Sequence, residues 1–247
     1  MQAHETIKKL SDEQVEDFDM EYVTGELWDT LVMELDKADL VKADFSFLDI
    51  GGGNGVFTDR ILEQYPNSQG FLLDNSRFLL DKNKDHPRKT LVEASAESLT
   101  EIYADQKFDI IFMNWFLHHT VKSTFSGTLA TQREMLATAH SLLKSDGKLV
   151  IFENLPEGLL GERFCSFVIN RITSSKILAP FVKKMGGNTA GVGICFLGEK
   201  QWSEQFSKSG FSIASLKKFR PWDLNPIKKA LLTIKDVGEG LYILNKQ

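Results

Sequence analysis

The chain has 247 residues, of which 42% are hydrophobic and 26% are charged. This composition is typical of an ordinary globular protein, and the length fits one domain with a generous insertion or with a small lid. The formal net charge of −5 gives no electrostatic reason to expect nucleic acid as a partner.

Residues 1–44 precede the first predicted strand, and the sequence predicts an N-terminal helical cap there. Apolar residues recur at helical spacing between residues 6 and 40. Gly25 lies between two such segments and is expected to separate two helices. The simplest interpretation is that these helices pack against a sheet.

A glycine-rich turn follows the apolar residues 47–50. Asp49, Gly51, Gly53 and Gly55 fit the pattern D-x-G-x-G-x-G. Glycines at alternate positions allow positive φ and leave the backbone open to a ligand. The helix predicted after the turn offers free N–H groups that suit an anionic group. We therefore expect a ligand site at the carboxyl end of this strand.

The turn does not fit the dinucleotide pattern G-x-G-x-x-G, because Val56 or Thr58 stands where the third glycine is required. What remains resembles motif I of the class I S-adenosylmethionine-dependent methyltransferases. The resemblance covers residues 45–154 well and residues 199–246 loosely. It implies S-adenosylmethionine as cofactor and an α/β fold, a doubly wound seven-stranded sheet whose last strand is antiparallel.

Asp74 ends a predicted strand at residues 69–73, where a carboxylate can accept hydrogen bonds from both ribose hydroxyls. The alternative is an N-cap for a helix over residues 76–84. The resemblance implies further cofactor contacts from the neighbouring residue and from the ends of the next two strands, namely from Asn75, Ser95, Ala96 and Asn114. Ser95 stands where the family usually has an aspartate.

His118 and His119 follow the predicted strand at residues 108–113, and Glu153 follows the predicted strand at residues 148–152. Neighbouring parallel strands lie about 4.8 Å apart, so a histidine and a carboxylate at these ends could approach each other. A carboxylate would orient the imidazole and raise its basicity. The same arrangement resembles small-molecule O-methyltransferases, which implies a catalytic base. The sequence does not decide between the two histidines, and a buried structural histidine is the alternative.

A magnesium site is the alternative, because Asn114, Glu153 and Asn154 lie roughly where catechol-type O-methyltransferases place their metal ligands. Asn114 replaces a carboxylate, however, and hard cations prefer charged oxygen ligands. We therefore expect no metal.

Residues 155–198 interrupt the strand–helix alternation, with one or two helices predicted over residues 161–184 and a glycine-rich loop over residues 185–193. The prediction is a helical lid over the site, with a homodimer contact as the alternative. Residues 199–247 then complete the core sheet. The predicted substrate-binding residues are aromatic and come from the cap, the core, the lid and the C-terminal part: Tyr22, Trp28, Trp115, Phe164, Phe167 and Trp222.

The resemblance implies methyl transfer to a small, fairly apolar molecule of the natural-product or secondary-metabolite type, with O-methylation favoured. N- or C-methylation, or a non-catalytic cofactor-binding scaffold, are the alternatives. Cys165 and Cys195 support neither a disulfide framework nor a zinc site. No apolar run reaches membrane-spanning length and no signal region is visible, so we expect a cytoplasmic protein without a membrane partner.

Overall fold

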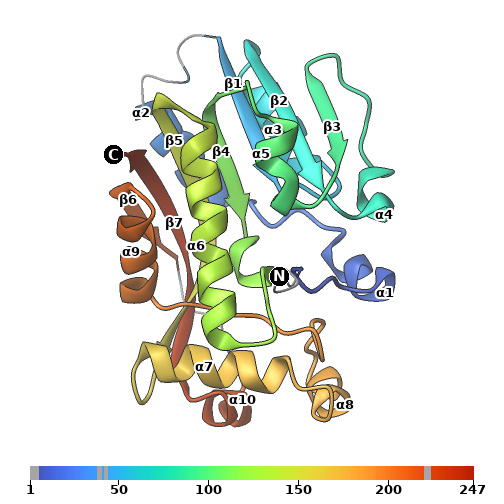
Figure 1. Ribbon diagram of the computed structural model, residues 1–247, viewed down its shortest axis with the longest axis vertical. Helices are drawn as coiled ribbons and strands as arrows, with labels where there is room; N and C mark the ends of the chain where they lie inside the picture. Colours follow the sequence, from blue (N-terminus) through green and yellow to red (C-terminus); the bar gives the residue numbers. More distant parts are fainter. Residues whose placement is uncertain (1–5, 38–40, 42–43, 220–223) are drawn as a thin grey trace, which may run out of the picture.

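The computed structural model describes residues 6–37, 41, 44–219 and 224–247. Its centre is one seven-stranded sheet with the strand order β3-β2-β1-β4-β5-β7-β6 (Figure 1). The first five strands run parallel, whereas β7 pairs antiparallel with both β5 and β6. The predicted fold class is confirmed. The strands are β1 (Phe45–Ile50), β2 (Ser68–Asp74), β3 (Lys89–Glu93), β4 (Phe108–Asn114), β5 (Leu143–Gly158), β6 (Phe211–Lys218) and β7 (Ile234–Lys246).

Helices cover both faces of the sheet (Figure 1). Strand β4 shows why: Ile110 and Phe112 pack into one apolar cluster with α2 and α3, and Ile111 and Met113 pack into the other with α5, α6 and α9. A strand buried on both faces needs such a continuous apolar run. The helices of the core are α2 (Glu26–Lys37), α3 (Val56–Gln64), α4 (Arg77–Leu80), α5 (Leu99–Ile102), α6 (Phe125–Leu142) and α9 (Glu199–Lys208).

The remaining helices gather at the carboxyl ends of the parallel strands. They are α1 (Asp12–Val15) in the cap, α7 (Glu162–Thr173) and α8 (Ala179–Lys184) in the lid, and α10 (Pro226–Leu231). The cap touches the lid, since the Gln14 side-chain amide donates a hydrogen bond to the carbonyl of Asn188 at 2.7 Å. None of the helices in the described residues combines the length and hydropathy needed to cross a membrane.

Two strands are longer than the sequence predicts. Strand β5 continues to Gly158 and β7 begins at Ile234, because their extensions pair with each other from Asn154 opposite Glu239 onward. The backbone hydrogen bonds of this ladder do not depend on apolar side chains. The polar residues and the proline in it therefore break the apolar run from which a strand is predicted. The lid therefore begins later than the predicted boundary at residue 155, and its first helix starts at Glu162.

Candidate active site

A cavity of about 1060 Å³ lies where the sheet, the cap and the lid meet. Its lining comes from residues 7–23 of the cap, from the carboxyl ends of the parallel strands β1 to β4, from residues 172–196 of the lid, and from residues 224–239. Ligand pockets in proteins usually occupy about 300–1000 Å³, so this cavity can hold a nucleoside-sized ligand beside a second small molecule.

The turn after β1 leaves no space for side chains. Gly51 has a φ of +76°, and a Cβ there would lie 2.7 Å from the Phe116 ring. A Cβ at Gly52 would lie 2.6 Å from both the Asp49 carboxylate and Leu72. Gly52 was not singled out in the sequence, because the D-x-G-x-G-x-G pattern passes over it.

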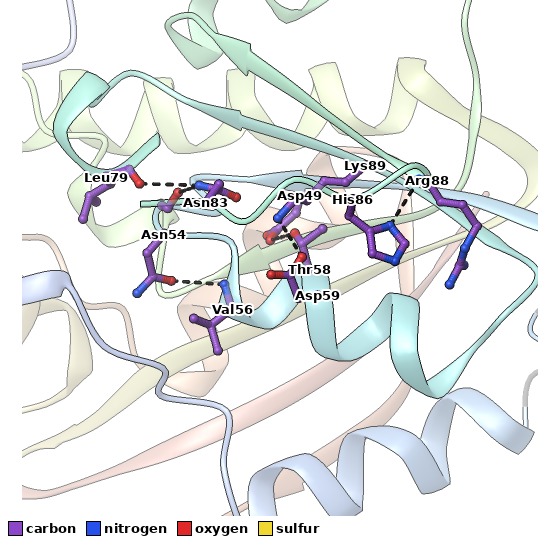
Figure 2. Close-up of polar contacts among 11 residues, drawn as sticks. Asp49, Asn54, Val56, Thr58, Asp59, Leu79, Asn83, His86, Arg88 and Lys89 are labelled. Atoms are coloured by element: carbon purple, nitrogen blue, oxygen red, sulfur yellow. Dashed lines mark hydrogen bonds and ion pairs between the residues drawn. The ribbon is translucent and has the colours of Figure 1, made fainter. Parts of the chain in front are cut away.

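The other two predicted glycines differ in position. Gly53 lines the cavity, but Gly55 does not. A Cβ at Gly55 would collide with Asn83, whose side-chain amide donates hydrogen bonds to the carbonyls of Gly53 at 2.9 Å and of Leu79 (Figure 2). The structure therefore does not bring Gly55 to the cavity wall: the lack of a side chain at Gly55 leaves room for Asn83, which is hydrogen-bonded to the turn.

Asp74 lies at the end of β2 and at the cavity wall. Its carboxylate accepts hydrogen bonds from the backbone N–H groups of Gly53 at 3.0 Å and Ser76 at 2.8 Å. Burial raises the pKa of Asp74 despite these donors. The N-cap of α4 is Ser76, which accepts from the N–H of Leu79, so the alternative of Asp74 as the helix cap is wrong. Asn75 also lines the cavity.

Asp49 is 1% exposed and lies directly beneath the turn. The hydroxyl of Thr58 reaches across from α3 and donates a hydrogen bond to its carboxylate at 2.7 Å (Figure 2). Burial raises the pKa of Asp49 to about 7, opposed by the Thr58 hydrogen bond and assisted by the negative charges of Glu21 and Asp74. Glu21 also lines the cavity, and no motif in the sequence indicated it.

The raised pKa of Asp49 predicts a pH-dependent stability. The folded protein binds this proton more tightly than the unfolded chain, so the stabilising contribution is present at acid pH and is lost as the pH rises through about 7. The free energy of unfolding of Asp49→Asn, relative to the wild type, should increase by about 2–4 kcal/mol between about pH 4 and pH 8. Urea unfolding at several pH values measures this difference. A constant difference across the range would contradict it.

The ends of β3 and β4 bring three further predicted residues to the cavity. The Ser95 hydroxyl accepts from the N–H of Glu97 at 3.3 Å, and Ala96 is buried beside it. The side-chain oxygen of Asn114 is buried and has no hydrogen-bond partner within the part of the chain that the structure describes. A buried acceptor of this kind costs free energy unless a ligand supplies a donor.

His118 and Glu153 form a buried pair. The carboxylate of Glu153, which is fully buried, accepts from the backbone N–H of His118 at 3.2 Å and lies 2.8 Å from its Nδ1. When Nδ1 carries the proton, this bond leaves Nε2 as an acceptor. His118 lines the cavity, whereas Glu153 does not. The structure therefore places His118 at the cavity wall and Glu153 behind it, in contact with the backbone N–H and the ring of His118.

His119 also lines the cavity but is held by aromatic contacts. Its ring lies 4.2 Å from that of His118 and packs edge-on against Phe18 at 5.2 Å. Its buried setting and the adjacent His118 lower the pKa of His119 well below its ordinary value. A neutral His119 within an aromatic contact is suited to shaping the cavity.

Tyr22 and Trp115 line the cavity together, with ring centroids 5.8 Å apart. The indole N–H of Trp115 donates to Asn154 at 3.1 Å, and its ring stacks on Phe152. Trp115 has a φ of +49°. A non-glycine residue in this region costs about 1–3 kcal/mol, and such strain is concentrated at functional sites.

Of four further predicted substrate residues, three lie away from this cavity. Trp28 packs beneath the Arg60 guanidinium at 3.8 Å, between α2 and α3. Phe164 and Phe167 are 45% and 42% exposed, because α7 turns the opposite side, including Cys165 and Ile169, toward the protein. The structure therefore does not place these three side chains at the cavity wall. The fourth, Trp222, lies outside the described residues.

Two of the three side chains considered as magnesium ligands, Glu153 and Asn154, are hydrogen-bonded to other residues. Both oxygens of Glu153 face His118, and the oxygen of Asn154 accepts from Trp115. Among the described residues, no group of three or more His, Cys, Asp or Glu side chains could hold a metal ion.

Residues 48–149 match the family model of a methyltransferase domain. The chain is 25% identical over 180 residues to malonyl-[acyl-carrier protein] O-methyltransferase 1 of Ilyobacter polytropus, a match that covers 60% of this chain and 66%, just under two thirds, of that protein. Two solved structures share the fold. They are the cyclopropane synthase MmaA2 of Mycobacterium tuberculosis (18% identity, TM-score 0.58, 96% of this chain and 95% of that one) and magnesium protoporphyrin IX methyltransferase of Synechocystis with bound SAH (12% identity, TM-score 0.59, 95% and 93%).

Proposed function

Because the chain belongs to the class I S-adenosylmethionine-dependent methyltransferases, we propose that it methylates a hydroxyl oxygen of a small, fairly apolar molecule. The observation that carries this proposal is the buried pair of His118 and Glu153 at the cavity wall. An acceptor carboxylate carries no proton at neutral pH, so a base would have nothing to remove from it. A hydroxyl acceptor does need a base.

The residues of the cavity fit the cofactor. The turn at Gly51–Gly53 admits no side chain, which supports close approach of a ligand to the backbone. Asp74 offers a carboxylate at the end of β2 for the ribose hydroxyls. The unpartnered oxygen of Asn114 and the buried carboxylate of Asp49 suit the cationic amino-acid part. When bound, S-adenosylmethionine supplies a methyl group on a positively charged sulfur.

The proposed base is His118 rather than His119. Glu153 holds the Nδ1 proton of His118 and fixes the ring, so Nε2 is the acceptor for the hydroxyl proton as the O–CH₃ bond forms and the S–CH₃ bond breaks. Among the described residues His119 has no such carboxylate partner, and the lowered pKa of His119 makes it a poor proton acceptor. The walls of the cavity must hold the hydroxyl near the methyl carbon, which supplies much of the acceleration.

The residues that the lid contributes to the cavity support the proposal of an apolar acceptor, for example a molecule of the natural-product type. The contribution of the lid to the cavity is largely apolar and includes Ile172, Val182, Met185, Val192, Ile194 and Phe196. We favour a small molecule over nucleic acid, since the net charge of −5 supplies no attraction for phosphates. The two free, buried thiols of Cys165 and Cys195 support a reducing compartment such as the cytoplasm.

The test is an acceptor screen with methyl-labelled S-adenosylmethionine. Phenols, aliphatic alcohols, carboxylic acids and amines of matched carbon skeleton are compared by label transfer. The proposal expects transfer to hydroxyl acceptors above the others. If only the amines or only the carboxylic acids become labelled, the proposed methylation of a hydroxyl is wrong and the enzyme carries out N-methylation or carboxylate methylation instead. Tight cofactor binding with no transfer to any acceptor would favour the scaffold alternative.

Asp74→Ala should weaken binding of S-adenosylhomocysteine by about 1–3 kcal/mol, because the ribose hydroxyls would lose their acceptors. Isothermal titration calorimetry measures this change. Asp81→Ala is the control, since Asp81 lines the same region of the cavity but pairs with Arg77. An unchanged affinity for Asp74→Ala would remove Asp74 from the proposed site.

A further inference from the structure

The lid end of the molecule exposes an unusual number of apolar side chains. Among the described residues, nine of the sixteen large hydrophobic side chains that are clearly exposed belong to residues 159–181 or to α10. Ile177 is 91% exposed, Leu160 73% and Ile227 70%. Figure 1 shows that α7, α8 and α10 lie together at this end. Exposed apolar side chains gathered in this way mark an interaction surface.

The same end is basic although the chain as a whole is acidic. Between residues 155 and 198 there are five basic residues and two acidic ones, and all five basic residues are exposed. Lys183 and Lys184 form the last turn of α8, and Lys228 and Lys229 lie on α10. The net charge of the whole chain is −5, so the positive charge is concentrated here.

We propose that this lid surface, formed by residues 159–184 and α10, docks on an anionic phospholipid bilayer. Lysines beside protruding aliphatic side chains attract anionic headgroups while the apolar groups enter the interface. The exposed apolar groups come from residues 159–160 and 177–178 and from α7, α8 and α10, so they belong to several elements that need no single shaped partner, which suits a deformable bilayer. The sequence-based expectation of no membrane partner came from the lack of a spanning segment, and surface docking requires none.

A second copy of the chain fits this surface less well. A two-fold symmetric contact would place this basic surface against the same basic surface of the second copy. Like charges brought together in this way oppose association. The predicted homodimer through the lid is therefore disfavoured by charge, whereas an anionic surface is complementary.

Docking would bring the bilayer close to the cavity. Val182 of α8 and Leu231 of α10 line the cavity, while Phe181 and Ile227 of the same helices point into solvent. An apolar acceptor dissolved in the bilayer would then be near the apolar half of the cavity. The docking inference itself does not depend on the proposed methyl transfer.

The test is cosedimentation of the full chain with vesicles of phosphatidylcholine, with or without about one third phosphatidylglycerol. We expect binding to the anionic vesicles only, and weaker binding as salt is added. Ile177→Asp combined with Ile227→Asp should lower the bound fraction about tenfold or more. Met33→Asp combined with Ile102→Asp is the matched control, because it adds the same charge at exposed apolar positions elsewhere.

Lys183→Gln combined with Lys184→Gln should reduce binding several-fold and flatten its dependence on salt. Binding of S-adenosylhomocysteine by each variant verifies folding and cofactor binding separately from docking. The proposal is overturned if neither vesicle is bound, if both are bound equally, or if the control pair loses as much binding. A dimer in sedimentation velocity that Ile177→Asp with Ile227→Asp dissolves would assign the surface to a second copy instead.

Discussion

Replacing His118 by asparagine is expected to lower the turnover of methyl transfer about 100-fold or more while leaving the affinity for S-adenosylhomocysteine unchanged. The asparagine amide can still donate to Glu153 in place of Nδ1, so the fully buried carboxylate keeps a partner. What disappears is Nε2, the proposed proton acceptor. Initial rates with the best acceptor from the screen, together with calorimetry, measure both quantities.

His119→Asn is the matched control for this experiment. His119 is adjacent, lines the same cavity and contacts Phe18, but it lacks the carboxylate partner. We expect a much smaller loss of turnover from this variant. If His119→Asn abolishes transfer and His118→Asn does not, the two roles are reversed. If neither variant slows the reaction, positioning of the acceptor alone accounts for catalysis.

Glu153→Gln separates positioning from proton transfer. The amide can donate where the carboxylate accepts, and the Nε2 atom of His118 can then become the protonated nitrogen. This variant should therefore lose turnover although it leaves His118 in place. Retained activity in Glu153→Gln, combined with inactivity in His118→Asn, would show that the histidine works without an orienting carboxylate.

Gly52→Ala is expected to reduce the free energy of unfolding by about 1–3 kcal/mol and to weaken S-adenosylhomocysteine binding by at least a similar amount. The added methyl group would lie 2.6 Å from the buried side chains of Asp49 and Leu72, so the turn must move. That movement displaces the backbone of Gly53, which donates to Asp74. Thermal unfolding and calorimetry measure the two effects.

Two further glycine variants separate steric clash from backbone strain. Gly25 has a φ of +52° and open space around a Cβ, so Gly25→Ala introduces strain alone, at a cost of about 1–2 kcal/mol. It should leave cofactor affinity unchanged. Gly51→Ala combines a φ of +76° with a contact to Phe116. Equal cofactor affinity in Gly52→Ala and wild type would mean that the turn does not form the binding surface.

The core of the fold was predictable because its signals are local. Strands β1 and β4 are continuous apolar runs, and the glycines at residues 51–55 disclose where the chain must turn tightly. The placement of Asp74 and His118 at the cavity followed from strand ends meeting at one edge of a parallel sheet.

The sequence did not predict which side chains line the cavity wherever that depends on tertiary contacts. Trp28 and Phe164 are aromatic residues near the expected site, but the phase of their helices turns them elsewhere. The contributions of Glu21 and Lys228 to the cavity have no sequence motif, because they depend on how the cap and α10 fold back over the sheet. A contact between Glu153 and one of the two histidines was expected from the sequence, but which histidine makes it depends on the 3-10 turn at Leu117–His119.

The ladder between β5 and β7 has a mechanical consequence. It continues the main sheet as far as Gly158, so the lid helices begin from a stiff two-stranded support. The N-terminal segment from residue 6 onward, in contrast, is held to the rest of the protein by isolated hydrogen bonds. Examples are the hydrogen bond from the Gln14 side chain to the Asn188 carbonyl and the one from the Lys8 N–H to the Val121 carbonyl. Of the parts that line the cavity, residues 7–23 are therefore the ones whose local opening is expected to cost the least free energy, and opening them would expose the cavity without disturbing the sheet.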